Sequence, residues 1–336
     1  MKYIIYGRNR KTAHLALFLS LLLSCAAWAG DKEAETDQNA EANKNAAEDS
    51  QELPEAEDGL SVKNEWDFVE SSMDISGGIP ENAGGRLERI RETGVLTVAT
   101  EPYFAPQEFI DPTKNGQDQY VGSDMEMAKR IAQRMEAELV IVPLEFTEVL
   151  EGMIEGKYDL AISGLAYTPG RARSMELSKG YYFTDEEAAV GLLIREEDKD
   201  LIKGIADLSD KNIIAQSGSL QEAVMAENVT AYREFRRVPS VQDVYLALEH
   251  KETDAGMTDV DTAKQYIRKN PDCHLMLVPG VEFSLEEECK GDRVAAPLGE
   301  TELICFVNGV IDELLQSGEY DKWYDEYTEF AAQLEE

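Results

Sequence analysis

Few side chains in this sequence have the types and spacings that catalysis or metal binding requires. Beyond the N-terminal stretch, the histidines are His250 and His274, and neither belongs to a cluster with the spacing of zinc ligands. The chain has no Gly-x-Ser-x-Gly nucleophile motif, no glycine-rich phosphate loop with its lysine and no dinucleotide-binding fingerprint. We therefore predict binding without chemistry, with no catalytic residue, no metal and no cofactor.

The charge of the chain restricts its partners. Its 336 residues include 67 Asp and Glu against 32 Lys and Arg, a formal net charge of -35. Binding to nucleic acid, or to anionic lipid, requires cations that face phosphates, so this balance excludes nucleic acid as a partner. Residues 1–30 contain four basic and no acidic residues, residues 31–85 contain 16 acidic and three basic residues, and residues 86–336 have a net charge of -26.

Residues 1–29 have the pattern of an export signal. Basic residues precede the apolar run 13–23, which is shorter than the roughly 20 residues of a membrane-spanning helix. Cleavage after Ala27-Trp28-Ala29 is one interpretation; alternatively, the segment ending in Cys25 resembles a bacterial lipobox, with Cys25 lipidated. An acidic low-complexity tether over residues 30–85 favours anchoring. We predict a protein that is periplasmic or lipid-anchored on the outer face of the bacterial cytoplasmic membrane.

Three further cysteines leave the disulfide state open. Export permits disulfides, and Cys273 with Cys289 is the favoured pair. Cys305 lies in an apolar run, which predicts a buried free thiol. Because three cysteines leave one unpaired, no pairing is assigned from the sequence.

The body of the chain alternates predicted strands and helices. Short apolar runs predict buried strands at residues 95–99, 139–142, 158–162, 212–215 and 254–257. Ser123-Asp124-Met125-Glu126 has the pattern of a capping box and predicts a helix with Met127, Ile131 and Met135 on one face. Ser240 is predicted to cap another helix. This alternation indicates an α/β fold whose sheets are covered on both faces.

The alternation recurs, which suggests two related lobes. When Asp159 is aligned with Asp254, residues 150–161 superpose on residues 245–256 with the same order of helix and strand. Ligands of open α/β sheets bind beyond the carboxyl ends of the strands. We therefore expect the function to lie in the loops that follow Ala99, Ile162, Ala215 and Met257.

Four segments of the body together resemble one protein family. They are Gly122–Ala128 with Ile131-Ala132, Tyr167–Arg171 with Leu177-Ser178 and Tyr181-Tyr182, Thr253–Asp259, and Gly318–Tyr320 with Trp323. In this order, over about 86–330, they are similar to the family 3 extracellular solute-binding proteins, the polar amino-acid receptors of ABC importers. The resemblance implies high-affinity binding of a polar L-amino acid outside the cytoplasm and its delivery to the membrane permease of an ABC importer, without chemistry.

The resemblance also implies an architecture. Proteins of this family have a two-lobed periplasmic-binding-protein-like fold, in which each lobe is a mostly parallel sheet flanked by helices and two hinge strands join the lobes. It places a first lobe at residues 86–184 and 284–336 and a second lobe at residues 185–283. We expect a monomer that closes around its ligand.

A free amino acid carries a carboxylate and an ammonium, and each needs a partner when it is buried. By the resemblance, Arg171 pairs with the carboxylate through its planar fork, and Asp259 accepts the ammonium from the opposite lobe. The Gly164 carbonyl adds an acceptor, and Ser163 lies beside it. Ala166 stands where relatives usually have a hydroxyl, so it offers its backbone N–H alone.

The resemblance also predicts which residues contact the side chain of the ligand. Phe104 and Phe146 match an aromatic clamp, and the loop with Gln216 and Ser219 supplies donors across the cleft. Glu101 occupies a position where the family often has an acid that faces the ligand side chain. An acid there favours a donor group, which predicts Gln, Arg, Lys or His over Asp or Glu.

Simpler interpretations compete with these assignments. Arg171 could form a surface ion pair, Asp259 could be a helix N-cap, Phe104 and Phe146 could be core residues, and Glu101 could lie on the solvated surface. Among functions on the same fold, the alternatives are a cyclohexadienyl dehydratase-like enzyme, whose substrate also carries carboxylates, and a ligand-sensing module.

Overall fold

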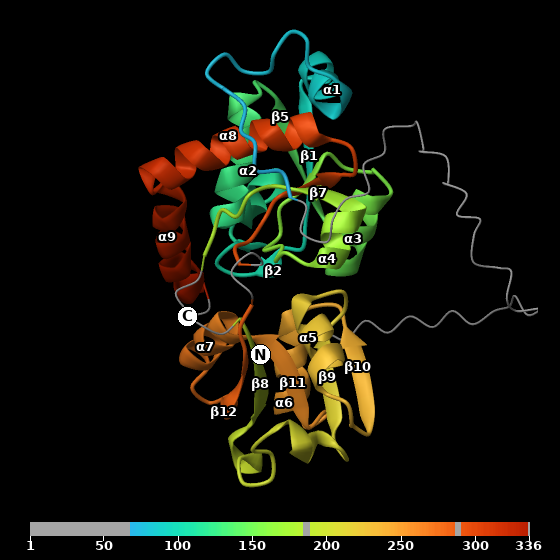
Figure 1. Ribbon diagram of the computed structural model, residues 1–336. Helices are drawn as coiled ribbons and strands as arrows, with labels where there is room; N and C mark the ends of the chain where they lie inside the picture. Colours follow the sequence, from blue (N-terminus) through green and yellow to red (C-terminus); the bar gives the residue numbers. More distant parts are fainter. Residues whose placement is uncertain (1–67, 184–188, 286–289, 335–336) are drawn as a thin grey trace, which may run out of the picture. The chain divides into compact units, whose positions relative to one another are not determined.

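Two five-stranded sheets organise residues 68–183, 189–285 and 290–334, which the computed structural model describes (Figure 1). The order of the first sheet is β5-β1-β6-β13-β7, with β1 at Val95–Thr100, β5 at Glu138–Pro143, β6 at Leu160–Ala161, β7 at Met175–Leu177 and β13 at Ala295–Pro297. The order of the second sheet is β10-β9-β11-β8-β12, with β8 at Val190–Arg195, β9 at Asn212–Gln216, β10 at Glu234–Val238, β11 at Ala255–Asp259 and β12 at Leu275–Phe283. A small third sheet contains β2 (Tyr103–Phe104), β3 (Glu108–Ile110) and β4 (Tyr120–Val121).

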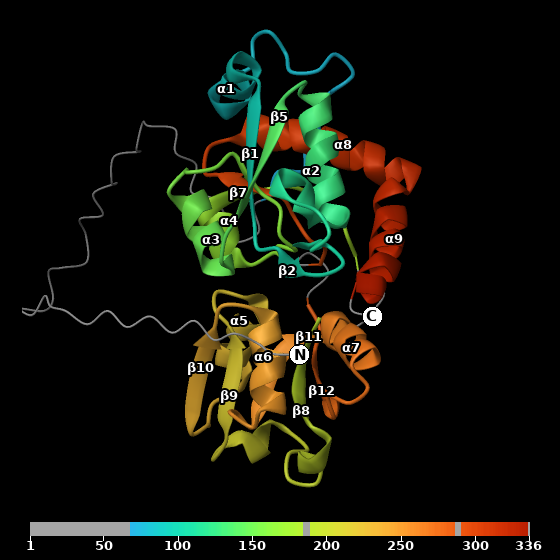
Figure 2. The same ribbon diagram turned by 180° about the vertical axis from the view of Figure 1, so that it is seen from behind.

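Helices cover both faces of the first sheet (Figure 2). On one side lie α1 (Gly85–Thr93), α2 (Ser123–Arg134) and α8 (Thr301–Ser317), and on the other lie α3 (Phe146–Ile154) and α4 (Pro169–Ser174). The final helix, α9 (Glu319–Leu334), packs against α2 and α8. Side chains alternate along β1, so that Leu96 and Val98 enter one core cluster and Ala99 enters the other. Met127, Ile131 and Met135 of α2 are all buried in the first cluster, as their spacing predicts.

The second sheet is also covered on two sides. Its helices are α5 (Leu220–Asn228), α6 (Val241–Glu249) and α7 (Val260–Lys269). Neighbouring residues of β9 again divide between two clusters, with Ile213 beside α5 and Ile214 beside α6. Ser240 caps α6 through a capping box with Asp243, as predicted. The predicted α/β class with two sheet-based lobes is therefore confirmed.

Each sheet combines parallel and antiparallel pairings. β1 is parallel to β5 and β6, and β9 is parallel to β10 and β11, as helix–strand alternation predicts. β13 is antiparallel to β6 and β7, and β8 is antiparallel to β11 and β12. These antiparallel strands adjoin the two places where the chain passes between the sheets. The sheets are accordingly more mixed than the mostly parallel ones expected.

The predicted capping box at the start of α2 is wrong. Gly122 is the N-cap, and no side chain caps this helix. Gly122 has φ 126°, and a Cβ there would lie 2.0 Å from the carbonyl oxygen of Gln107, so the turn requires glycine. Ser123 is instead the first helical residue and is buried, with its hydroxyl donating to Tyr320 at 3.1 Å.

Residues 68–84, within the range expected to be a tether, pack on the first lobe. The Val69 N–H donates to the Leu177 carbonyl at 2.9 Å, and the Met73 N–H donates to the Cys305 carbonyl at 2.8 Å. The Asn308 side chain donates to the Ser71 carbonyl at 2.9 Å, and Ile75 is buried. Apolar residues distinguish this stretch from the polar one before it. The predicted signal peptide, Cys25 and the tether up to residue 67 lie outside the described residues.

The state of the described cysteines differs from the disulfide that the sequence favoured. Cys273 and Cys305 are free, partly buried thiols. The preference for a disulfide between Cys273 and Cys289 is thus contradicted, and Cys289 itself lies outside the described residues. None of the helices within residues 68–183, 189–285 and 290–334 is long and apolar enough to cross a membrane.

Candidate functional site

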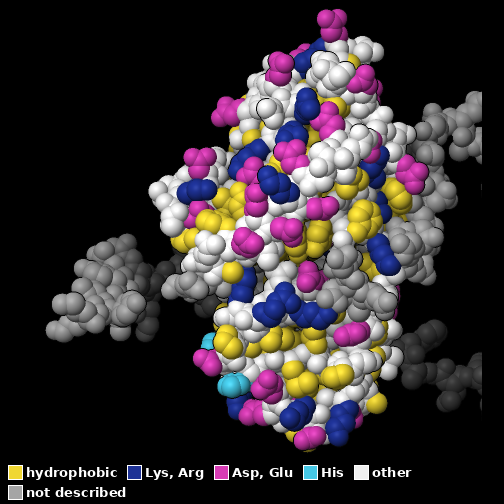
Figure 3. Space-filling model, turned by 90° about the vertical axis from the view of Figure 1, so that its left-hand side faces the viewer, with side chains coloured by type: hydrophobic (Ala, Val, Ile, Leu, Met, Phe, Trp, Pro, Cys, Tyr) yellow, Lys and Arg dark blue, Asp and Glu magenta, His cyan; other side chains and the backbone are white. Residues whose placement is uncertain are grey.

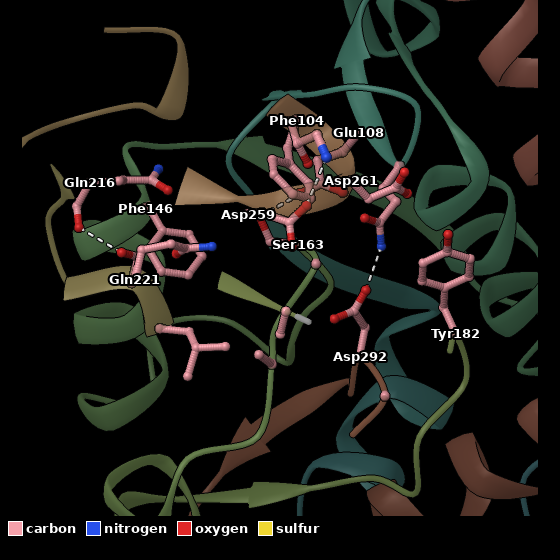
Figure 4. A pocket seen from close by; sticks show the side chains of 18 of the residues that line it. Phe104, Glu108, Phe146, Ser163, Tyr182, Gln216, Gln221, Asp259, Asp261 and Asp292 are labelled. Carbon is pink, nitrogen blue, oxygen red and sulfur yellow. Dashed lines mark hydrogen bonds between the residues drawn. The ribbon is translucent and has the colours of Figure 1, made fainter. Parts of the chain in front are cut away.

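A pocket between the two sheets gathers every residue that the sequence assigned to a ligand. Figure 4 labels Phe104, Phe146, Ser163, Gln216 and Asp259 among them. Its volume is about 140 Å³, compared with the roughly 10–15 Å³ that one water needs. The lining comes from the carboxyl ends of β1, β6, β9 and β11 and from the starts of α3 and α5. The assigned residues in the lining are Glu101, Phe104, Phe146, Ser163, Gly164, Ala166, Arg171, Gln216, Ser219 and Asp259. Their roles toward a ligand remain predictions.

The guanidinium of Arg171 is buried and fixed by backbone carbonyls from both lobes. Thr168 caps α4 by accepting from the Arg171 N–H at 3.1 Å. From there Nη1 donates to the Ala166 carbonyl at 2.5 Å, and Nη2 donates to the Gly218 carbonyl at 3.1 Å. No carboxylate within the described ranges forms an ion pair with Arg171, so the surface ion-pair alternative is wrong. Burial lowers its pKa to about 10, which leaves the group charged at neutral pH.

Asp259 is at the end of β11 and caps α7. Its Oδ1 accepts from the Thr262 N–H at 2.8 Å. Burial raises its pKa to about 6, and the Thr262 hydrogen bonds partly offset this shift. The N-cap interpretation is thus confirmed, and the same carboxylate also faces the pocket.

Glu101 follows β1 and is only 2% exposed, which contradicts the alternative of a solvated surface residue. Its backbone N–H donates to Ser163 Oγ at 2.9 Å. Its Oε1 is buried without a hydrogen-bond partner among the described residues. Burial raises the pKa of Glu101 to about 8, although a hydrogen bond with Gln216 opposes the shift. A buried carboxyl with an unused acceptor suits a ligand that brings a donor.

The two aromatic residues border the pocket from different elements. Phe104 is on β2, and Phe146 is the first residue of α3. Gly164 has φ +50°, and a Cβ there would lie 3.2 Å from the Phe104 ring, so glycine permits this close approach. Phe146 is also part of a core cluster, and its ring centroid lies 5.3 Å from Cζ of the Arg171 guanidinium. The core interpretation of Phe146 is thus correct as well.

Gln216 and Ser219, at the end of β9 and in the loop after it, form hydrogen bonds with the protein's own backbone. Ser219 Oγ donates to the Gln216 carbonyl at 2.7 Å and caps α5 by accepting from the Glu222 N–H at 3.1 Å. Gln216 Nε2 donates to the Pro239 carbonyl at 3.0 Å. The hydroxyl of Ser219 is therefore engaged in this structure, and the predicted role of the loop as a donor to the ligand stays a prediction.

Several lining residues were missed by the sequence analysis. Gln107 and Glu108 follow Phe104, while Asp292 lies in the segment that returns to the first lobe. Tyr182 and Tyr324 stack with ring centroids 4.4 Å apart. Glu108 and Gln107 had a local signal, since they continue the loop that carries Glu101. Asp292 and Tyr324 had none, because they are far from the other site residues in the sequence.

Behind the pocket lies a buried acidic network. Ser163 Oγ donates to Glu108 Oε1 at 3.2 Å. Asp124 accepts from the hydroxyls of Tyr181 at 2.8 Å and Tyr320 at 2.7 Å, and from the Gly164 N–H at 3.1 Å. Burial raises the pKa of Glu108 and of Asp124. These bonds fix the Ser163–Gly164 backbone at the pocket wall.

The pocket is more acidic than basic. Among its described lining residues five are acidic and two are basic: Glu101, Glu108, Asp259, Asp261 and Asp292, against Arg171 and Lys290. On the face of the molecule in Figure 3, Asp and Glu side chains are interspersed with Lys and Arg side chains. The excess of acidic residues is therefore a property of the pocket, and it can be considered separately from the total net charge of the chain.

Known proteins resemble this chain over most of its folded part. A probable histidine-binding protein from Campylobacter jejuni is 27% identical over 243 residues, which cover 70% of this chain and 85% of that protein. A cyclohexadienyl dehydratase from Pseudomonas aeruginosa is 28% identical over 187 residues, which cover 56% of this chain and 67% of that protein.

A solved structure gives a further comparison. An amino acid ABC transporter substrate-binding protein from Streptococcus pneumoniae, bound to L-arginine, superposes with a TM-score of 0.64 and 32% identity, covering 74% of this chain and all of that one. A model of the bacterial extracellular solute-binding proteins, family 3, matches residues 96–330. The chain therefore belongs to family 3 of the bacterial extracellular solute-binding proteins.

Proposed function

We propose that this protein binds a free polar L-amino acid in the pocket between its lobes and delivers it to an ABC importer, and that the preferred ligand has a cationic side chain. The observation that carries the proposal is the buried guanidinium of Arg171, which has no carboxylate partner among the described residues and shares its pocket with Asp259. An α-carboxylate would pair with Arg171 and an α-ammonium with Asp259, so that both ligand charges are compensated.

The ligand side chain follows from the remaining charges. After Arg171 and Asp259 are assigned, the pocket still holds Glu101 with an unused buried oxygen. A guanidinium, ammonium, imidazole or amide group could donate to that oxygen, whereas an acidic side chain would meet repulsion. The histidine-binding relative and the arginine-bound neighbour support this choice. We therefore favour arginine, histidine or lysine, with glutamine as a neutral alternative.

Transport would use closure of the lobes. Arg171 belongs to the first lobe and Asp259 to the second, so a ligand that pairs with both stabilises the closed state. We take the first lobe to be residues 86–184 and 284–336 and the second to be residues 185–283. The exported location is that of the family, and we propose anchoring through Cys25, a monomeric state and a cognate permease as its partner.

Calorimetry of the full chain against the twenty amino acids tests this proposal. We expect micromolar binding or tighter, about -8 kcal/mol, for one or a few polar L-amino acids with a donor side chain. Absence of binding to every amino acid would contradict the proposal.

A dehydratase is the second candidate, because two observations favour it. One is the similarity to the Pseudomonas aeruginosa enzyme. The other is Glu101, a buried pocket carboxyl whose raised pKa of about 8 would suit a general acid. Incubation with the cyclohexadienyl carboxylates prephenate and arogenate distinguishes the two functions. We expect no turnover above the uncatalysed rate, and product formation without amino-acid binding would favour the enzyme.

A further inference from the structure

Asp292 enters the pocket from the chain segment that returns from the second lobe to the first. Its N–H donates to the Tyr182 carbonyl at 3.0 Å, and its carbonyl accepts from the Tyr181 N–H at 2.9 Å. Gln107 Nε2 donates to Asp292 Oδ2 at 2.8 Å. Figure 4 shows this bond and the carboxylate pointing into the pocket. Within residues 68–183, 189–285 and 290–334, no donor engages Oδ1.

The surroundings of Asp292 place it near the groups proposed to bind the α-carboxylate and α-ammonium. Burial raises the pKa of Asp292 to about 7, with a further increase from Asp124 and Asp259 and opposing effects from Gln107 and Arg171. Asp292 is likewise the carboxylate whose charge raises the pKa of Arg171 against the effect of burial. It is therefore within electrostatic reach of both Arg171 and Asp259.

Glu101 has different neighbours, so it does not duplicate Asp292. Apart from burial, its pKa responds to Gln216, Glu145 and Asp243. The Asp292 partner Gln107 is instead close to Gly164, because a Cβ on that glycine would lie 3.6 Å from Gln107 Oε1. The carbonyl of Gly164 is the acceptor proposed for the ligand ammonium.

We propose that Asp292 is a third ligand-binding carboxylate, which accepts a hydrogen bond from the α-ammonium group of the ligand through Oδ1. An ammonium has three N–H donors. Asp259 and the Gly164 carbonyl take two of them, and Asp292 takes the third. The ammonium is then held by the second lobe, the first lobe and the connection between them. This inference rests on the proposed function and specifies how the same pocket selects a free amino group.

The charges around Asp292 favour a role in binding the ligand over a role in stabilising the fold alone. Gln107 is neutral and bonds one oxygen, while Asp124 and Asp259 repel the ionised carboxylate. Arg171 is a cation whose charge lowers the pKa of Asp292, and in the proposed complex Arg171 is shared with the ligand carboxylate. A bound ammonium would supply positive charge between Asp259 and Asp292.

The test compares two ligands that differ in the amino group alone. L-Arginine and its des-amino analogue 5-guanidinopentanoate are titrated calorimetrically into the full chain and its Asp292→Asn variant. We expect the variant to lose roughly 10- to 100-fold in affinity for L-arginine, the range for a hydrogen bond to a charged group. It should change less than about threefold for 5-guanidinopentanoate, because that ligand never makes the bond. Unchanged binding of the analogue would also show that the variant is folded.

Asp261→Asn is the matched control, since it removes another pocket carboxylate. Asp261 accepts from the Tyr324 hydroxyl at 3.2 Å and from Gln265 at 3.4 Å. We expect this variant to weaken both ligands by one common factor. If Asp292→Asn lost affinity equally for both ligands, or lost none for L-arginine, the proposed role of Asp292 would be overturned. The proposed function of the protein would still stand. If the unmodified chain bound no amino acid, the proposed function would fall, and this inference with it.

Discussion

The two ends of the pocket differ in how their charges are arranged. One end combines the cation of Arg171 with the carboxylates of Asp259 and Asp292. The other end has the buried carboxyl of Glu101 beside Gln216, with Glu108 hydrogen-bonded to Ser163 nearby. All amino acids share the same two α-groups and differ in their side chains. The comparison therefore suggests that the first end sets affinity for amino acids as a class and the second end chooses among them.

The two ends also differ in how firmly their groups are held. The Arg171 guanidinium is fixed by two backbone carbonyls, one from each lobe. Glu101 Oε1 is buried without a partner among the described residues. A fixed cation needs little rearrangement to receive a carboxylate, whereas an unpaired acceptor gains most from a ligand with the right donor.

The largest expected effect is at the end that binds the α-groups. Arg171→Ala should lower affinity for every bound amino acid by about 2–5 kcal/mol, because a buried carboxylate loses its cation. Arg171→Lys should retain only part of the affinity that Arg171→Ala loses, because lysine cannot donate two parallel hydrogen bonds to a carboxylate. Calorimetry across the ligand panel measures both variants. A loss limited to cationic ligands would contradict the assignment of Arg171 to the α-carboxylate.

A smaller loss is expected for Asp259→Asn. Removing the charge should weaken binding by about 1.5–3 kcal/mol, the range for hydrogen bonds to charged groups. Asn caps helices about as well as Asp, so loss of the cap should not by itself lower the free energy of unfolding. Calorimetry and urea unfolding separate the two roles. Lower stability with unchanged affinity would mean that Asp259 serves as the N-cap of α7 alone.

Glu101→Gln should change ligand preference more than overall affinity. The charge-assisted bond to a cationic side chain becomes a neutral one, which is worth about half as much. We expect the ratio of L-arginine to L-glutamine affinity to fall roughly tenfold, about 1.4 kcal/mol. Competition between the two ligands measures the ratio directly. An unchanged ratio would remove Glu101 from the end that binds the side chain.

The broadest expected effect is that of pH. Burial raises the pKa of Glu101 to about 8, of Asp292 to about 7 and of Asp259 to about 6. In the unfolded chain the pKa of each of these carboxyls is about 4. Their contribution to the stability of the ligand-free protein is therefore fully present below about pH 4 and is lost as pH rises to about 8.

Affinity for a cationic ligand should show the opposite trend. It should rise between about pH 6 and 8, because the ligand binds the ionised carboxylates. Urea unfolding and calorimetry at several pH values test the pair of trends. If stability and affinity both rose with pH, the prediction that these pocket carboxylates ionise between about pH 6 and 8 would be contradicted.

The predictable parts of the fold and the site have local signals. Helix–strand alternation identified the parallel strands, and Ser240 was correctly predicted to cap a helix. Most of the assigned residues line one pocket because they follow the carboxyl end of a predicted strand or begin the next helix, whereas Arg171 lies inside α4 and Phe104 on β2.

What the sequence did not reveal depends on contacts between distant segments. Asp292 follows a glycine in a short charged stretch, and its place in the pocket comes from pairing with Tyr181 and Tyr182. The capping box failed because Gly122 packs on Gln107, which turns Ser123 toward Tyr320. No local pattern encodes these approaches.

The most direct test of the central claim, that Arg171 recognises the α-carboxylate, is a cycle with L-arginine and agmatine, its decarboxylated analogue. Calorimetry with the unmodified chain and Arg171→Ala gives all four affinities. We predict that the unmodified chain binds L-arginine at least about 100-fold more tightly than agmatine, and that Arg171→Ala nearly abolishes this difference. An equal preference for L-arginine in both proteins would contradict the account.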